Sequence, residues 1–401
     1  MISLKGKCVV LGVTGSIAAY KTAALASMLV KAGAHVEVIM TKNAANFINP
    51  ITFDTLTHNR CITETFDRDH EFSVEHVSLA KRADVFLVAP ASANVIGKIA
   101  SGIADDMLTT TIMACRCPKI ISPAMNTNMF ENPILQDNLK KLEGYGYEII
   151  KPESGMLACG DNGAGRMPEP EVLFDYIVRA AAFEKDLAGK TALVTAGPTC
   201  EAIDPVRFIT NHSTGKMGYA IAYNLVMRGA SIKLVSGPVS IAPPPFAEVI
   251  NVVSAADMAE AVKKYAPESD IIIKAAAVAD YRPADPASEK IKKSDDDASI
   301  RLERTEDILA YLGKHKREGQ FICGFSMETE NMLENSVAKL KKKNVDMIVA
   351  NNLKTPGAGF GTDTNVVTII TGDNIRELPI MSKDEVAASI VDEIKGRINR
   401  N

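Results

Sequence analysis

The sequence predicts an α/β protein of two Rossmann-like domains, each built on a parallel sheet. Its length of 401 residues is more than one domain usually contains. Two segments, residues 7–41 and 190–236, repeat the order strand, glycine turn, helix, strand, and MLVKAGAHVEVI in the first parallels NLVMRGASIKLV in the second. Parallel sheets are assembled from this unit, so we expect both halves to share one architecture.

The first repeat shows why these elements are expected. Apolar residues recur at helical spacing between Ile17 and Ala32, which predicts a helix with one buried face. HVEVIM at 35–40 is rich in β-branched residues and predicts a buried strand. Ser16 stands just before the helical pattern, and we expect its side chain to cap the helix.

A charged linker divides the two halves. The segment FEKDLAGK, at 183–190, follows a helical pattern, and the second repeat begins directly after it. We therefore predict one domain over residues 1–188 and another over residues 189–401.

The composition is that of an ordinary globular protein. Hydrophobic residues make up 46% and charged residues 23%, and the net charge is −4, which predicts no nucleic-acid partner. No apolar run reaches the roughly 18 residues that a membrane span requires, and the first residues do not resemble a signal peptide. We expect a cytoplasmic protein with no membrane association.

The cysteines do not form a recognisable framework. There are seven, at positions 8, 61, 115, 117, 159, 200 and 323. An odd, scattered set argues against a disulfide network, and the C-x-C pair at 115–117 lacks further ligands at zinc-site spacing. Cys159 lies in a glycine-rich segment, GMLACGDNGAGRM, so a thiol that performs chemistry on a movable loop stays open as its role.

Several loops follow the predicted strands, at the edge where open α/β sheets bind ligands. In the first half they are GVTGS, MTKNA, APASANVIGK and SPAMNTNM. GVTGS can present backbone N–H groups to a phosphate, but it does not complete G-x-G-x-x-G, and taken alone it is explained better by an ordinary sharp turn. In the second half, NHSTGKMG lacks two features of a Walker loop, and EKIKKSDDD has the composition of a solvated loop.

Taken together, the motifs resemble two enzyme families. GSIAAYK, EHVSLAKRAD, APASAN, PAMNTNM and ACGDNGAGRM resemble the flavin-dependent phosphopantothenoylcysteine decarboxylases. AGPTCEAIDPVRFITNHSTGKMG, AAAVADYRPA, EKIKK and GFSMETE resemble the phosphopantothenate–cysteine ligases. The resemblance covers nearly the whole chain, in the order of the fused bacterial enzymes of coenzyme A biosynthesis. It implies a flavoprotein-type first domain and a homo-oligomer in which neighbouring subunits build the flavin site.

For the first half the resemblance implies FMN-dependent oxidative decarboxylation. The substrate's cysteinyl thiol is oxidised to a thioaldehyde, carbon dioxide leaves, and the enethiol is protonated and reduced to 4'-phosphopantetheine. Cys159 would be the acid on a flap over the substrate, since a thiol of ordinary pKa is protonated at neutral pH. His76 would be a base or an orienting group, and Asn126 would grip the substrate carboxylate. The residues expected to hold FMN are Gly15, Ser16, Thr41, Ser92, Ala93, Asn94 and Met125.

For the second half the resemblance implies ligation of cysteine to 4'-phosphopantothenate. CTP would activate the carboxylate as an acyl-cytidylate, and the cysteine amine would then attack. Asn211 would hold this intermediate with Arg207, Ser213 and Gly215 nearby, and Lys290 would be the catalytic lysine. Mg²⁺ is expected with the triphosphate, bound by unknown ligands. The residues expected to bind the nucleotide are Ala275, Ala276, Asp280, Lys290, Glu306, Asp307, Ile308, Leu309, Phe325, Lys339 and Lys343.

Two other classes of protein fit the sequence less well. A nicotinamide oxidoreductase should carry the full dinucleotide fingerprint and an acidic residue about 20 positions later, which GVTGSIAAYK does not supply. A regulatory subunit with a flavoprotein fold should have a damaged flap or lack the histidine. His76, Asn126 and Cys159 are all present.

Overall fold

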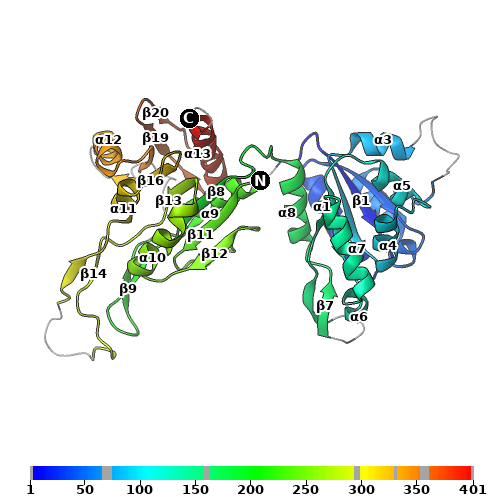
Figure 1. Ribbon diagram of the computed structural model, residues 1–401, viewed down its shortest axis with the longest axis horizontal. Helices are drawn as coiled ribbons and strands as arrows, with labels where there is room; N and C mark the ends of the chain where they lie inside the picture. Colours follow the sequence, from blue (N-terminus) through cyan, green and yellow to red (C-terminus); the bar gives the residue numbers. More distant parts are fainter. Residues whose placement is uncertain are drawn as a thin grey trace. The chain divides into compact units, whose positions relative to one another are not determined.

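The structure, a computed structural model, describes residues 3–65, 75–156, 160, 162–292, 299–328, 332–352 and 361–398. It divides into two units, Met1–Phe183 and Glu184–Asn401, which are called unit 1 and unit 2 below. Both are α/β units with parallel sheets, which confirms the predicted fold class (Figure 1). The division of activities at residue 188 stays a prediction. No helix of the described chain has the length and apolar character that crossing a membrane requires.

Unit 1 contains a five-stranded, wholly parallel sheet. Its strands are β1 (Cys8–Val13), β2 (His35–Met40), β3 (Val85–Ala91), β4 (Lys119–Pro123) and β5 (Glu148–Ile149). Their spatial order is β2-β1-β3-β4-β5. The order of the strands therefore reverses between β1 and β3. Such a switch point leaves a crevice at the carboxyl ends of the strands, and FMN occupies it in flavodoxin-like folds.

Helices cover both faces of this sheet. On one face, α3 (Glu75–Arg82), α4 (Ala93–Ser101), α5 (Met107–Ala114) and α7 (Pro133–Gly144) bury residues such as Phe86 and Ile121. The others are α1 (Ala19–Lys31), α2 (Pro50–Thr57), the short α6 (Thr127–Phe130) and α8 (Pro170–Ala181), and α8 packs on α1 and β3. A hairpin of β6 (Glu153–Met156) and β7 (Asn162–Arg166) lies outside the sheet.

The prediction that Ser16 caps the first helix is wrong. Helix α1 begins at Ala19, and its N-cap residue is Ala18, which has no side-chain cap. The Ser16 hydroxyl accepts only a long hydrogen bond from Ala18 N, at 3.4 Å. Ser16 thus lies in the loop between β1 and α1, where its side chain can face a ligand.

Unit 2 contains an eight-stranded sheet. Its strands are β8 (Thr191–Ala196), β11 (Ser231–Ser236), β12 (Glu248–Asn251), β13 (Ile271–Lys274), β16 (Phe321–Glu328), β17 (Met347–Asn352), β19 (Val367–Thr371) and β20 (Ile375–Glu377). The order is β12-β11-β8-β13-β16-β17-β19-β20, and the last two strands pair antiparallel. The six parallel strands follow the order 3-2-1-4-5-6 of dinucleotide-binding folds, with the switch point between β8 and β13.

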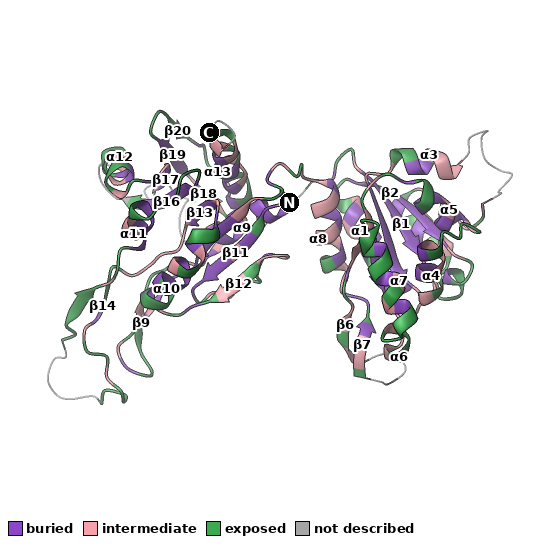
Figure 2. Ribbon diagram, in the orientation of Figure 1, coloured by how far each residue is buried: buried purple, intermediate pink, exposed green. Residues whose placement is uncertain are grey.

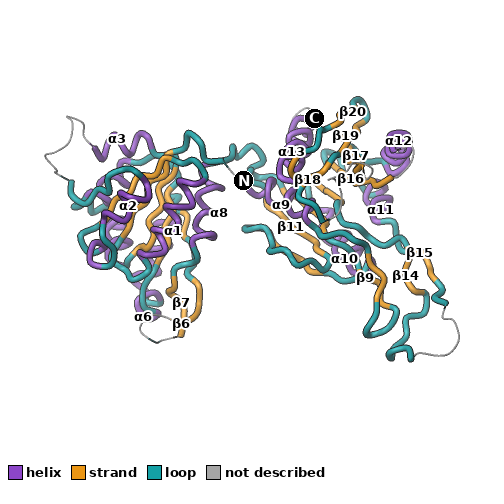
Figure 3. Tube along the Cα trace, turned by 180° about the vertical axis from the view of Figure 1, so that it is seen from behind, coloured by secondary structure: helices purple, strands orange, loops and turns teal. Residues whose placement is uncertain are grey.

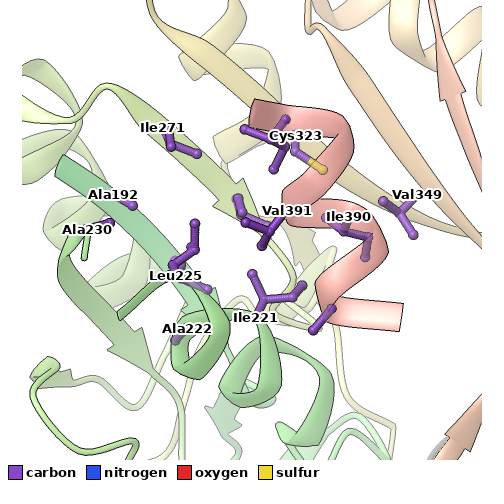
Figure 4. Packing of buried hydrophobic residues seen from close by; sticks show 14 of the residues in the cluster. Ala192, Ile221, Ala222, Leu225, Ala230, Ile271, Cys323, Val349, Ile390 and Val391 are labelled. Carbon is purple, nitrogen blue, oxygen red and sulfur yellow. The ribbon is translucent and has the colours of Figure 1, made fainter. Parts of the chain in front are cut away.

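Two hydrophobic cores lie on opposite faces of this sheet. On one face, α9 (Lys216–Met227) and α13 (Lys383–Ile398) pack on alternate strand residues such as Ile271 and Val349 (Figure 4). On the other, α10 (Ala255–Tyr265), α11 (Ile308–Lys314) and α12 (Met332–Lys343) cover the intervening residues. In Figure 2 the strands of both sheets are mostly buried, as expected for sheets covered on two faces.

Short hairpins extend from unit 2. One pairs β9 (Cys200–Ala202) with β10 (Phe208–Thr210), and another pairs β14 (Tyr281–Pro283) with β15 (Leu302–Arg304). Both project from the body of the unit (Figure 3). A third small ladder joins β18 (Thr364–Asn365) to β21 (Met381–Ser382). The sequence motifs between Cys200 and Asn211 and between Asp280 and Lys290 lie on or beside the two projecting hairpins.

Candidate active sites

Two adjoining cavities open at the switch point of unit 1. One has a volume of about 560 Å³ and the other about 760 Å³. Both are lined by Gly15 from the loop after β1, Ser92 and Ala93 from the start of α4, and Met129 from α6. Every residue predicted to hold FMN lines at least one of them. Ser16 and Met125 line the smaller, Thr41 and Asn94 the larger, and Gly15, Ser92 and Ala93 line both.

A buried threonine fixes the two loops that meet here. Thr14 Oγ1 donates to Pro90 O at 2.7 Å and accepts from Ser92 N at 2.8 Å. The Gly15 loop therefore has a defined position relative to Ser92. Gly15 also passes close to the loop after β2, because a Cβ at this position would lie 2.8 Å from Asn43 Cβ. A close backbone approach with hydroxyl groups around it fits the phosphate end of FMN.

The β6–β7 hairpin packs on the loop that carries Asn126. Met125 N donates to Gly165 O at 3.1 Å. A Cβ at Gly165 would lie 2.2 Å from Met125 O, and one at Gly163 would lie 2.6 Å from Thr127 Oγ1. Cys159 lies outside the described residues, between the two strands of this hairpin. Asn126 lines the smaller cavity, with Met156 and Arg166 of the hairpin.

Lys21 anchors the end of the hairpin, a role that the sequence did not indicate for this individual residue. Its side chain is almost fully buried in α1, and Nζ donates to Met167 O at 2.8 Å and to Glu169 Oε1 at 2.9 Å. The contact with Lys21 is the main cause that lowers the pKa of Glu169. A buried lysine within an otherwise apolar helical face is the signal that could have identified it.

Within one chain, His76 lies on a helix that is distant from the β6–β7 hairpin. It lies on α3 and lines neither cavity in the described part of the chain. In Figures 1 and 3, α3 and the β6–β7 hairpin lie at opposite ends of unit 1. The predicted role of His76 stays a prediction.

A third cavity, of about 250 Å³, opens at the switch point of unit 2. Its walls come from the loop before α9, from residues 275–278 after β13, and from the ends of β16 and β17. Asn211 Nδ2 donates to Ala277 O at 3.0 Å, which joins two of these walls. Gly215 has a φ of +78°, and a Cβ there would lie 2.7 Å from Val239 Cγ1. Six predicted residues line this cavity: Asn211, Ser213, Gly215, Ala275, Ala276 and Phe325.

Other predicted nucleotide residues form a charged group beside this cavity. Lys343 forms an ion pair with Asp307, the N-cap residue of α11. Lys339 Nζ donates to Phe325 O at 3.1 Å, and Phe325 itself lines the cavity. Glu306 pairs with Lys263 at 2.6 Å, and Thr305 N donates to Asp280 O at 3.0 Å. Ile308 and Leu309 are buried in the core, so their side chains support α11.

Arg207 and Lys290 lie on the projecting hairpins rather than in the cavity wall. Arg207 forms an ion pair with Asp204 and donates from Nη2 to Ile291 O at 3.0 Å. Lys290 is exposed. The described residues contain no group of three or more histidine, cysteine or acidic side chains that could hold a metal ion. None of the six described cysteines forms a disulfide.

Lys274 is a charged residue of this region that no sequence motif singled out. It ends β13 beside Gly324, on the face of the sheet that α11 and α12 cover. Its ammonium group has no hydrogen bond or ion pair with the described residues, although Asp307 and Asp280 are close enough to act on it. Burial, followed by the nearby Lys339, lowers the pKa of Lys274 to about 8. Its position after three isoleucines made it appear to be an ordinary strand end.

The comparisons with known proteins match both units. Residues 3–182 match the family model "Flavoprotein", and residues 187–397 match "DNA/pantothenate metabolism flavoprotein C-terminal domain". A coenzyme A biosynthesis bifunctional protein CoaBC from Bacillus subtilis (strain 168) is 50% identical over 98% of this chain and 97% of its own. A structure of a CoaBC C-terminal domain is 44% identical, covering 54% of this chain and all of its own, with a TM-score of 0.47. A structure of a PPC decarboxylase mutant complexed with pantothenoylaminoethenethiol is 32% identical, covering 43% and 96%, with a TM-score of 0.39.

Replacing Gly165 by alanine should detach the hairpin from the Asn126 loop. The φ of +137° is unfavourable for alanine, and the new Cβ would overlap Met125 O, so we expect a loss of about 2 kcal/mol or more of local stability. Hydrogen–deuterium exchange of residues 162–166 measures this loss. The matched control is Gly155→Ala on the paired strand, where the nearest atom is 3.9 Å away. Equal exchange in the two variants would contradict the proposed packing.

Replacing Lys274 by methionine should stabilise unit 2 in a pH-dependent way. The folded state lowers the pKa from 10.5 to about 8, so the protonated lysine costs the fold about 3 kcal/mol below pH 8. The unfolded chain binds the extra proton between these two values, so wild-type stability rises with pH across this interval. The gain from Lys274→Met should therefore be largest at pH 7 and should disappear towards pH 10.5.

Urea unfolding at several pH values, followed by hydrogen exchange in α10–α12, measures this effect. Lys341→Met, at an exposed position of α12, is the control and should show no such trend. A gain for Lys274→Met that does not change with pH would contradict a lysine whose pKa is lowered by burial.

Proposed function

Because this chain belongs to the family of bifunctional proteins of coenzyme A biosynthesis, we propose which of its two units carries each activity. The chain is an enzyme with a decarboxylase half and a phosphopantothenate–cysteine ligase half. Unit 2 uses CTP to join cysteine to 4'-phosphopantothenate through an acyl-cytidylate. Unit 1 uses FMN to convert the product to 4'-phosphopantetheine. Residues 1–188 and 189–401 carry these two activities.

One observation carries this proposal. In each unit, residues of the family motifs line a cavity at the point where the strand order reverses. Cofactors and nucleotides bind at such points because the neighbouring loops diverge and leave backbone N–H groups free. The chemistry is then decided by the side chains around each cavity.

The cavities of unit 1 have the residues needed to hold FMN. Gly15 and Ser16 hold its phosphate, while Thr41, Ser92, Ala93 and Asn94 contact the ribityl chain or the ring. Met125 supplies an apolar surface at the edge of the ring. When bound, FMN accepts two electrons from the substrate and later returns them.

The hairpin and the Asn126 loop act on the substrate. Asn126 orients the carboxylate by hydrogen bonding and supplies no positive charge, so the carboxylate is not stabilised against its loss as carbon dioxide. Cys159 Sγ gives a proton to the carbon of the enethiolate. Packing of the hairpin against residues 125–127 excludes water from this step.

His76 acts in a neighbouring subunit. Its distance from the hairpin within one unit supports a homo-oligomer in which α3 of one copy completes the cavity of the next. Exposed apolar residues at the rim of the smaller cavity, among them Ile17, Tyr20 and Met156, support the same arrangement.

Replacing Cys159 by serine should stop unit 1 after decarboxylation, because a serine hydroxyl is a much poorer acid. Wild-type protein given 4'-phosphopantothenate, cysteine and CTP should yield 4'-phosphopantetheine. The variant should instead yield the unreduced enethiol and leave the flavin absorbance bleached. Mass spectrometry of the products measures this difference, and Cys8→Ser, at the amino end of β1, serves as the thiol control at the edge of the sheet opposite the cavities. Normal amounts of phosphopantetheine from Cys159→Ser would rule out the acid role.

The cavity of unit 2 holds the reacting carboxylate. Asn211 and Ser213 bind the acyl-cytidylate, and the first turn of α9 presents backbone N–H groups to its phosphate, since Gly215 leaves them without a side-chain cap. Residues 275–276 and Asp280 contact the cytosine. Lys339 and Lys343 attract the triphosphate. Mg²⁺ enters with CTP, bound mainly by phosphate oxygens and water.

Replacing Lys290 by glutamine should separate the two steps of ligation. The exposed ammonium group follows the phosphates and assists the attack of the cysteine amine. The variant should therefore still release pyrophosphate and form the acyl-cytidylate, but amide formation should fall sharply. Pyrophosphate release measured against amide product tests this, with Lys314→Gln as an exposed control. Equal loss of both products would place Lys290 in activation instead, and no loss would leave it as a solvated residue.

A further inference from the structure

Three hydrogen bonds tie the segment that carries Lys290 to the loop after β9. Ala287 N donates to Ile203 O at 2.9 Å, and Ile291 N donates to Asp204 Oδ2 at 3.1 Å. Arg207 Nη2 donates to Ile291 O at 3.0 Å. These bonds flank Lys290 on both sides, although the two segments are more than 80 residues apart in the chain.

Asp204 is the centre of this group. Its side chain is fully buried, whereas most of the surrounding loop is exposed. Oδ1 accepts from Val206 N and Arg207 N, both at 2.8 Å, which closes the turn of its own loop. Oδ2 accepts from Ile291 N and from the guanidinium of Arg207, with Nε at 2.9 Å. The two oxygens thus have different partners: Oδ1 holds the turn, and Oδ2 holds Arg207 and the Lys290 segment.

The carboxylate stays charged at any working pH. Its hydrogen bonds with Arg207, together with those from Val206, Ile291 and Arg207 N, hold the pKa of Asp204 well below its usual value. A buried carboxylate with this many donors is fully compensated, so removal of the charge leaves donors without an acceptor.

The described residues hold the segment around Lys290 through the backbone groups of Ala287 and Ile291. The Lys290 side chain is exposed, and no residue that the structure describes forms a hydrogen bond or ion pair with it. The position of its ammonium group therefore depends on where the backbone at Ile291 is fixed. Holding that backbone reduces the conformations that must be searched before the amine attacks.

We propose that Asp204 is a positioning residue for the ligase reaction, which holds Lys290 in place through the backbone N–H of Ile291. This inference rests on the role proposed above for Lys290. It assigns to Asp204 no contact with substrate. It also gives Arg207 a second task, because its guanidinium binds both Asp204 and Ile291 O while half of its side chain stays exposed.

The substitution Asp204→Asn separates the two tasks of the carboxylate. An amide oxygen at Oδ1 still accepts from Val206 N and Arg207 N. The amide NH₂ at Oδ2 then faces the N–H groups of Ile291 and Arg207, which are also donors, so the bond to the Lys290 segment is lost. Asp204→Ser is a second variant, because a serine hydroxyl can close the turn but is too short to reach Ile291.

In the full-length protein, both variants should reproduce the pattern expected for Lys290→Gln. Amide formation should fall about ten-fold or more, while pyrophosphate release stays within about two-fold of wild type. Hydrogen–deuterium exchange should increase in residues 286–292 and stay unchanged in the sheet. Asp285→Asn, which removes an exposed pair with Arg301 on the same projecting hairpin, should change neither rate.

A double variant shows whether Asp204 acts through Lys290. If it does, Asp204→Asn combined with Lys290→Gln should form amide no more slowly than Lys290→Gln alone. Additive losses, or equal loss of pyrophosphate and amide when Lys290→Gln separates them, would overturn the proposal. If Lys290→Gln itself lowers both rates, the role of Lys290 in transfer is wrong. The positioning role of Asp204 is then supported only if the Asp204 variants lower pyrophosphate release and amide formation in the same ratio as Lys290→Gln does.

Discussion

In both units, a buried threonine at the switch point fixes the geometry on which the candidate sites depend. Thr14 bridges the loop after β1 to the loop after β3, and Thr195 Oγ1 accepts from Ala276 N at 3.2 Å. Thr199 adds a second link in unit 2, accepting from Ala279 N at 3.0 Å. Reversal of the strand order opens a crevice, but it does not determine the width of that crevice. These side-chain hydrogen bonds restrict that width, because each joins residues at the carboxyl ends of neighbouring strands or in the loops that follow them.

The parallel strands and their covering helices were readable from the sequence because their signals are local. A β-branched run such as HVEVIM predicts a strand, and apolar residues at helical spacing predict a helix, without reference to the rest of the chain. The glycine turns that follow β1 and β8 were readable for the same reason. The resemblance then supplied candidate site residues, and those expected to hold FMN and many of those expected in unit 2 line cavities in the structure.

The contacts that shape the sites were not readable, because they join distant segments. Gly165 packs on Met125 O because the β6–β7 hairpin lies against the Asn126 loop, and no local sequence pattern predicts that contact. Lys274 looked like a strand end, and its burial became visible only when α11 and α12 were in place. Ser16 was expected to be a helix cap because it precedes an apolar pattern, but the helix begins three residues later, at Ala19. His76 belongs to a motif of the first half and yet lies away from the cavities of its own unit.

The two sites differ in whether their lysine side chains are paired with carboxylates. In unit 1 the lysines at the cavities are paired: Lys42 with Glu64, Lys98 with Asp105 and Asp106, and the buried Lys21 with Glu169. Unit 2 gathers Lys274, Lys339 and Lys343 around Asp307 and Asp280, and the burial of Lys274 costs folding energy. Lys274, whose ammonium group forms no ion pair with the described residues, distinguishes the unit 2 site from these paired cations.

The close packing of β7 on residues 125–127 also restricts how the first site can evolve. A side chain at residue 165 would displace the backbone of the loop that carries Asn126, and one at residue 163 would displace the side chain of Thr127. Gly165 and the Asn126 loop are therefore constrained together, because a side chain at position 165 would require a compensating shift of the backbone at Met125.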